Sequence, residues 1–140
     1  MRKTFVAVMV LAVVAMALPA AAGGRPLQAT LTGAAEVPGP GDPDGSGSAA
    51  ITINQGRGEI CFDIAVADVA EISAAHIHDA PAGVASGFVV NFNVAENGLS
   101  GCVPVDKGLA KAIRQNPGDY YVNVHNADFP AGALRGQLEK

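Results

Sequence analysis

Residues 49–66 read AAITINQGRGEICFDIAV, and this stretch decides the fold. Apolar side chains recur at every second position on both sides of a polar, glycine-rich centre at residues 54–58. Successive side chains of a strand point to opposite faces of a sheet, so this alternation predicts a β-hairpin with one buried face. The side chains expected to face the core are Ile51, Ile53, Ile60, Phe62, Ile64 and Val66.

Similar strand-like runs cover most of the remaining chain, separated by segments rich in Gly, Pro, Asn and Asp. They lie at residues 26–33, 71–80, 87–94, 99–105, 120–127 and 133–139. Residues 106–118 differ, because their apolar side chains recur at helical spacing between a capping Asp106 and a terminating Pro117. The pattern predicts an all-β fold, an antiparallel immunoglobulin-like or Greek-key β-sandwich of about seven or eight strands with one short helix.

The first 22 residues have the three parts of a secretory signal peptide. Arg2 and Lys3 precede an apolar run, and the small residues at 20–22 fit a cleavage site. An uncleaved anchoring helix is the alternative, but the apolar run is short for a membrane span. We therefore predict a signal peptide at 1–22, a single domain at 23–140, and a secreted or periplasmic location.

Charge excludes several classes of partner. Loss of Arg2 and Lys3 with the leader would reduce the basic residues from 9 to 7, against 13 acidic ones. An acidic domain without a cluster of Lys and Arg is a poor candidate for binding nucleic acid or an anionic membrane. We expect neither nucleic acid nor a membrane span after cleavage. The protein partner and the oligomeric state stay open.

The chain contains two cysteines, Cys61 and Cys102. In an oxidising compartment an even pair indicates one disulfide bond. Metal ligation by the two thiolates is the alternative, although no Cys-x-x-Cys motif is present. We predict the disulfide.

All three histidines lie in two strand-like runs, SAAHIHDA at 73–80 and YYVNVHNA at 120–127. Strand alternation places His76 and His78 on one face, opposite Ala75 and Ile77. In the second run His125 likewise lies opposite the apolar positions. If the two strands are neighbours, the three imidazoles can converge on one ion, so His76, His78 and His125 form a candidate metal site.

Nearby polar residues are candidates for supporting that site. The carboxylates of Asp79 and Asp128 and the hydroxyl of Tyr121 are possible second-shell partners of the imidazole rings. Imidazole suits copper or zinc better than calcium or magnesium. The alternative is that the histidines are solvated, or that they bond only Tyr121, Asn123 or a loop backbone and fix the local structure, in which case no cofactor is bound.

Other chemistry is poorly represented. The sequence contains no Gly-x-Ser-x-Gly motif, no P-loop and no evident pair of catalytic carboxylates. Arg135 could reach a carboxylate on a neighbouring strand, with Glu36 as a possible partner, or could bind an anion. We therefore favour a binding protein over an enzyme, without identifying any catalytic residue.

Three segments resemble the CHRD domain, first described in the developmental regulator chordin. They are LQATLTGAAEVPGP at 27–40, AAHIHDAPAGVASGFVVNF at 74–92, and NPGDYYVNVHNADFPAGALRGQL at 116–138. The resemblance implies an extracellular immunoglobulin-like or related β-sandwich. The chain departs from the family pattern at Asp79-Ala80, at Ser86-Gly87-Phe88 and at Ala133, where an acidic residue is usual.

A weaker similarity connects the histidine strands with copper/zinc superoxide dismutase, but only His76, His78 and His125 match that pattern. The leading prediction is an exported CHRD-type binding module of unknown partner, with a candidate three-histidine copper or zinc site. A copper-dependent oxidoreductase and an inert structural or adhesive domain are the alternatives.

Overall fold

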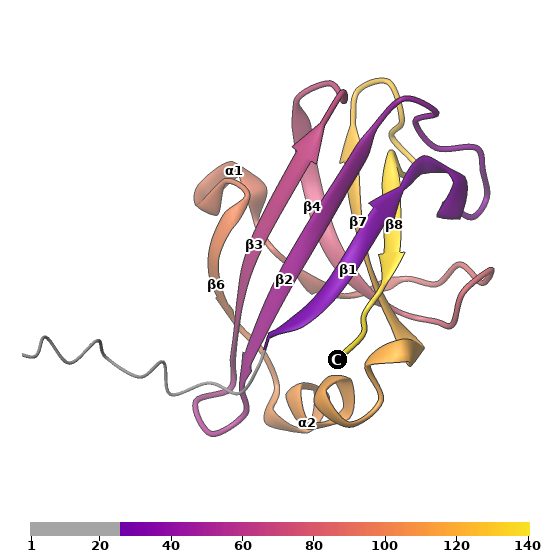
Figure 1. Cartoon of the computed structure of the whole chain (residues 1–140). Helices are drawn as coiled ribbons and strands as arrows, with labels where there is room; N and C mark the ends of the chain where they lie inside the picture. Colours follow the sequence, from indigo (N-terminus) through magenta and orange to yellow (C-terminus); the bar gives the residue numbers. More distant parts are fainter. Residues whose placement is uncertain (1–25) are drawn as a thin grey trace, which may run out of the picture.

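A computed structural model of the chain describes residues 26–140, so the signal peptide expected at 1–22 lies outside the described residues. Eight strands and two short α-helices make up this region (Figure 1). In chain order the elements are β1 (Leu27–Thr32), η1 (Gly33–Ala35), β2 (Ser46–Asn54), β3 (Glu59–Ala67), β4 (Ile72–Asp79), β5 (Phe88–Asn91), α1 (Val94–Asn97), β6 (Ser100–Pro104), α2 (Lys107–Gln115), η2 (Pro117–Asp119), β7 (Tyr120–Asn126) and β8 (Leu134–Gln137).

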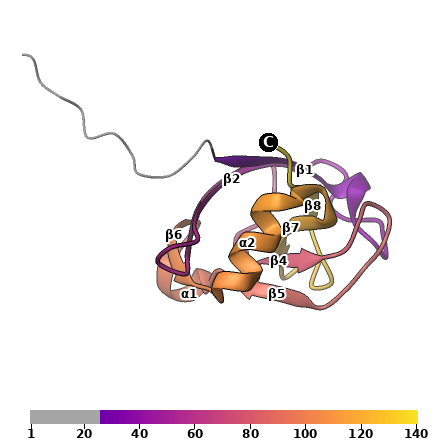
Figure 2. The same cartoon turned by 90° about the horizontal axis from the view of Figure 1, so that it is seen from below.

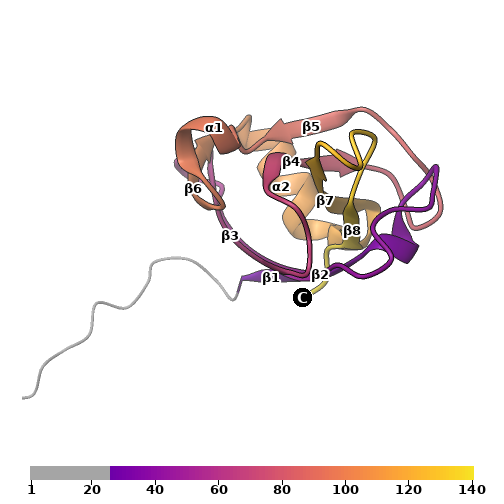
Figure 3. The same ribbon diagram turned by 90° about the horizontal axis from the view of Figure 1, so that it is seen from above.

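All eight strands belong to one antiparallel sheet of order β5-β4-β7-β8-β1-β2-β3-β6. The sheet curls until its two edge strands, β5 and β6, approach each other across α1, as the view from above shows (Figure 3). The fold is therefore nearly barrel-shaped. The all-β antiparallel prediction is confirmed, whereas the two stacked sheets of an immunoglobulin-like sandwich are not.

Strand β8 is the physical reason for this difference. It pairs with β7 over residues 134–137 and with β1 through Thr32 and Arg135. A second link, between Gln28 and Glu139, follows just beyond the strand. Because these contacts join the β4–β7 half to the β1–β2–β3 half, the two halves form a continuous surface. Alternation along a strand reveals which side chains face inward but not which strands pair.

The hairpin expected at residues 49–66 is confirmed, with β2 and β3 paired from Ser46↔Ala67 to Asn54↔Glu59. Its inward side chains join a core on the concave face of the sheet. The ring of Phe62 stacks on Phe92, with ring centroids 4.3 Å apart. Fully buried core side chains include Leu31, Ile51, Ile60, Ile77, Phe92, Val122, Val124, Leu134 and Leu138.

Helix α2 lies across the lower end of the curled sheet (Figure 2). Its side chains Ala110 and Ile113 are fully buried against the core. The Asp106 carboxylate accepts hydrogen bonds from the backbone N–H groups of Gly108 and Leu109, at 2.8 and 3.1 Å. The helix and its predicted N-cap are therefore confirmed. The sequence pattern did not predict the one-turn α1.

Replacement of this cap gives a first test of the fold. We expect Asp106→Ala to lower the free energy of unfolding by about 1 kcal/mol, because two backbone N–H groups lose their acceptor. Urea denaturation at neutral pH measures the change. The exposed Asp63 on β3 provides a control, and Asp63→Ala should change the stability by less than about 0.5 kcal/mol. Equal effects of the two substitutions would contradict the assigned cap.

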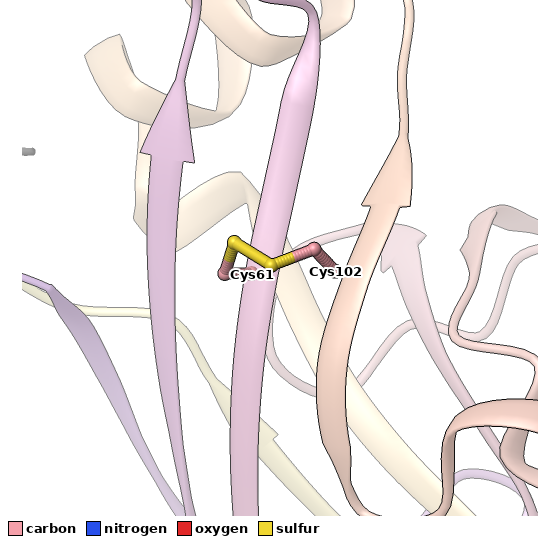
Figure 4. Close-up of a disulfide and its surroundings, with 2 residues drawn as sticks. All are labelled: Cys61 and Cys102. Atoms are coloured by element: carbon pink, nitrogen blue, oxygen red, sulfur yellow. A yellow bond between two sulfur atoms is a disulfide. The ribbon is translucent and has the colours of Figure 1, made fainter.

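The structure joins Cys61 of β3 to Cys102 of β6 in a disulfide bond (Figure 4). The two residues lie directly opposite each other in the ladder, with Cα atoms 4.0 Å apart. Strand β6 pairs only with β3, at the edge of the sheet. The disulfide therefore ties the last strand of the sheet to its one neighbour.

Candidate metal centre

The three histidines come from two paired strands and lie on the convex face of the sheet. Strands β4 and β7 are antiparallel neighbours, with His76 opposite Asn123 and Ala74 opposite His125. Ala75 and Ile77, the residues on either side of His76, are fully buried in the core. The expected alternation is thus confirmed, and one ring nitrogen from each histidine lies within 4.8 Å of the others.

Backbone carbonyls fix the position of the proton on two of the rings. Nδ1 of His78 lies 2.8 Å from the carbonyl oxygen of Ser86, and Nδ1 of His125 lies 3.1 Å from that of Pro130. A carbonyl oxygen only accepts, so each Nδ1 carries the hydrogen. In the neutral ring Nε2 then presents a lone pair.

These two lone pairs converge on the side chain of Asn123. Its Oδ1 lies 2.9 Å from Nε2 of His78 and 3.1 Å from Nε2 of His125. Nδ1 of His76 also lies 3.1 Å from Nε2 of His125. The side chain of Asn123 also interacts with Glu36, whose pKa it lowers against the larger opposing effect of burial. Oδ1 of Asn123 thus faces two ring nitrogens that carry no hydrogen, an arrangement of acceptor atoms that a shared cation stabilises.

Protons bind poorly at this position. Burial lowers the pKa of His76 from 6.5 to about 4, with further lowering by the neighbouring His125 and His78. Burial also lowers the pKa of His125, against the opposing effect of its hydrogen bond to Pro130. Since both rings are neutral near pH 7, their lone pairs are available to a metal ion.

Aromatic side chains hold the rings in place. His78 stacks on Tyr121 with centroids 4.6 Å apart and an interplanar angle of 7°. His76 stacks on Phe88 at 4.6 Å and 11°, and Phe88 itself is 56% exposed. Only 8% of His78 is accessible to solvent. The histidine face is therefore partly covered, by the β4–β5 connection and by the turn between β7 and β8.

The structure also places the three residues that the sequence suggested as possible partners of the rings, Asp79, Asp128 and Tyr121. Asp79 and Asp128 are exposed. Asp79 pairs across the ladder with Tyr120, whose pKa is raised by burial and further by the charge of Asp79. Tyr121 contacts His78 by stacking rather than through its hydroxyl. Backbone carbonyls and Asn123 meet the ring nitrogens, as the alternative of local hydrogen bonds had named.

The position of Glu36 beside the histidine cluster was not predicted from the sequence, which suggested it only as a possible partner of Arg135. It is 6% exposed, and among residues 26–140 its Oε1 has no hydrogen-bond partner. Burial raises its pKa from 4.5 to about 7, although the charge of Arg135 and hydrogen bonds from Asn123 and Val37 oppose the shift. Gly132, at φ +148°, packs so closely on this carboxylate that a Cβ atom there would overlap it. The β7–β8 turn is therefore built around Glu36.

Taken together, the fold and the site define an all-β domain that presents a cluster of three imidazoles on the outer face of a single curled sheet. The family model of the CHRD domain matches residues 27–138, and the chain belongs to the CHRD domain family. No curated protein and no solved structure matches the chain significantly. Within residues 26–140, the structure has no helix of the length and apolarity needed to cross a membrane.

Proposed function

We propose that this CHRD domain is an exported metal-binding module, in which His76, His78 and His125 bind one copper or zinc ion. The observation that carries the proposal is the direction of the imidazole lone pairs. Two rings hold their N–H groups on backbone carbonyls and turn their unprotonated nitrogens toward the same point. Histidine ligands of metal sites commonly have this second-shell arrangement.

Distances and ligand type support the choice of metal. Nδ1 of His76 and Nε2 of His125 lie 3.1 Å apart. Two nitrogens bound tetrahedrally at about 2.0–2.1 Å from one ion would be separated by about 3.3 Å. Neutral imidazole is a ligand suited to copper and zinc, whereas calcium and magnesium prefer oxygen. Three protein ligands leave a further coordination position for water or a partner group.

The proposed location outside the cytoplasm rests on two features. The first 22 residues have the pattern of a signal peptide. The disulfide between Cys61 and Cys102 is typical of proteins that fold in an oxidising compartment.

Calorimetric titration of the protein with Cu(II) and with Zn(II) at pH 7 tests the proposal. We expect one ion bound per chain, and His76→Ala and His125→Ala should each weaken binding on the order of 10–100-fold, because each removes a ligand. Asp128→Ala is the control, since this exposed carboxylate should leave the affinity unchanged. The absence of saturable binding, or binding insensitive to the histidine substitutions, would overturn the proposal.

A further inference from the structure

We propose that Arg135 is a positioning residue for His78, acting through the β4–β5 connection and through Tyr121. The part of this inference that concerns metal binding rests on the proposed function. The tautomer of His78, however, can be measured in the metal-free protein. The sequence suggested an ion pair or an anion-binding role for Arg135, and its contacts point elsewhere.

Arg135 is 1% exposed, and its guanidinium donates to oxygen atoms of neutral groups. It reaches the carbonyl of Val84 at 2.8 Å, the carbonyl of Pro81 at 2.9 Å, and Oε1 of Gln137 at 3.1 Å. Two of these three acceptors lie in the β4–β5 connection. A buried cation satisfied by backbone carbonyls fixes the conformation of the segment that supplies them.

That segment also supplies the acceptor for His78. The carbonyl of Ser86, two residues beyond Val84, accepts the hydrogen bond from Nδ1 of His78 at 2.8 Å. The exposed segment 81–87 contributes no side chain to the buried core. Its attachment to the sheet depends on polar contacts, and the fork of Arg135 provides two of them. Arg135 therefore holds in place the carbonyl that selects the Nδ1–H tautomer of His78.

A stack of three planar groups provides the second connection. The Cζ atom of Arg135 lies 3.4 Å from the ring centroid of Tyr121, and Tyr121 stacks on His78. Strand β7, which carries Tyr121, lies between β4 and β8 in the sheet. His78 and Arg135 therefore flank Tyr121 from opposite sides. Contact with a guanidinium on one face restrains the tyrosine ring against which the imidazole packs.

His125 serves as an internal reference, because its tautomer does not depend on Arg135. Its Nδ1 donates to Pro130, which lies in the turn that follows its own strand. Loss of the Arg135 contacts should thus affect His78 and leave His125 unchanged. A general loosening of the fold would affect both rings, so the comparison separates positioning from structural support.

Nitrogen-15 NMR of the imidazole rings in the metal-free protein tests the inference. In the wild type His78 and His125 should both carry the proton on Nδ1. In Arg135→Met the His78 signals should shift toward a mixture of the two tautomers, with those of His125 unchanged. Arg135→Lys keeps the charge without the two-pronged fork and should shift His78 in the same direction. The matched control is Arg114→Met, which removes an exposed guanidinium bonded to Gln55.

Copper titration of the same variants gives the second measurement. We expect Arg135→Met to weaken Cu(II) binding about tenfold, in the range typical of lost second-shell contacts. If wild type binds no metal but the His78 tautomer still responds, the proposed function fails and this inference stands. An unchanged His78 tautomer in the variants, or Nε2–H in the wild type, would overturn the inference. Should Arg135→Met fail to fold, Arg135→Lys and the wild-type spectrum decide the outcome.

Discussion

The double variant Cys61→Ala/Cys102→Ala is expected to have a free energy of unfolding about 4 kcal/mol lower than that of the oxidised protein. The bond spans a sequence separation of 41 residues. Its loss releases a large loop in the unfolded chain, and the entropy gained there accounts for a change of this size. Both side chains lie outside the buried core, so the alanines remove little packing.

Urea denaturation at pH 7 measures this change. The dependence of the free energy on urea concentration should also steepen, because an unfolded chain without the cross-link exposes more surface. Wild-type protein unfolded in the presence of a reductant should reproduce the variant, which provides the control. A loss below about 1 kcal/mol would show that the edge strand β6 is held by its hydrogen bonds and by α1 rather than by the covalent tie.

Replacement of Glu36 by glutamine is expected to stabilise the protein at pH 8 and to have little effect near pH 4. Burial raises the pKa of Glu36 from 4.5 to about 7. Between these two values the folded protein holds a proton that the unfolded chain has released, so rising pH destabilises the fold. Glutamine carries no charge and avoids this loss. The expected gain at pH 8 is about 2–3 kcal/mol.

His76 changes the stability in the opposite direction over a similar range of pH. Its pKa falls from 6.5 to about 4 on folding, so its contribution is present above pH 6.5 and is lost as the pH falls toward 4. In the wild type the opposite pH dependences of stability from Glu36 and His76 partly cancel. Without Glu36 the histidine contribution should be visible, as a stability that rises with pH between 4 and 6.5.

Urea denaturation of wild type and Glu36→Gln at pH 4, 6 and 8 measures both effects. The exposed Glu96 on α1 is the matched control, and Glu96→Gln should show the same pH dependence as the wild type. A stability difference between Glu36→Gln and wild type that does not grow with pH would contradict the raised pKa of Glu36.

Alternation along strands was enough to predict the face on which each histidine lies. The clustering of His76, His78 and His125 required in addition only that β4 and β7 be neighbours, which the structure shows. The helix at Lys107–Gln115 and its Asp106 cap could also be predicted, because both depend on residues close together in the chain. The family resemblance is confirmed over residues 27–138.

The contact of Glu36 with the site could not be predicted in this way. Glu36 and Asn123 come from distant parts of the chain, and only the folded structure brings them close enough for Asn123 to affect the pKa of Glu36. The pairing of the strands could not be predicted either. Nothing in residues 134–137 reveals that this strand contacts both β1 and β7, and that double contact replaces a two-layered sandwich with one curled sheet.

The place of β8 in the sheet has a consequence for when the histidine centre can form. Synthesis proceeds from the N-terminus, and β8 is the last of the described strands to be made, yet it inserts between β7, its immediate predecessor, and β1, the first strand. Residues 26–126 contain every histidine but neither Arg135 nor the strand that closes the sheet. The centre therefore cannot form until β8 has been made, and a chain synthesised only to residue 126 would display its imidazoles without Arg135 and without the carbonyl of Pro130 that binds His125.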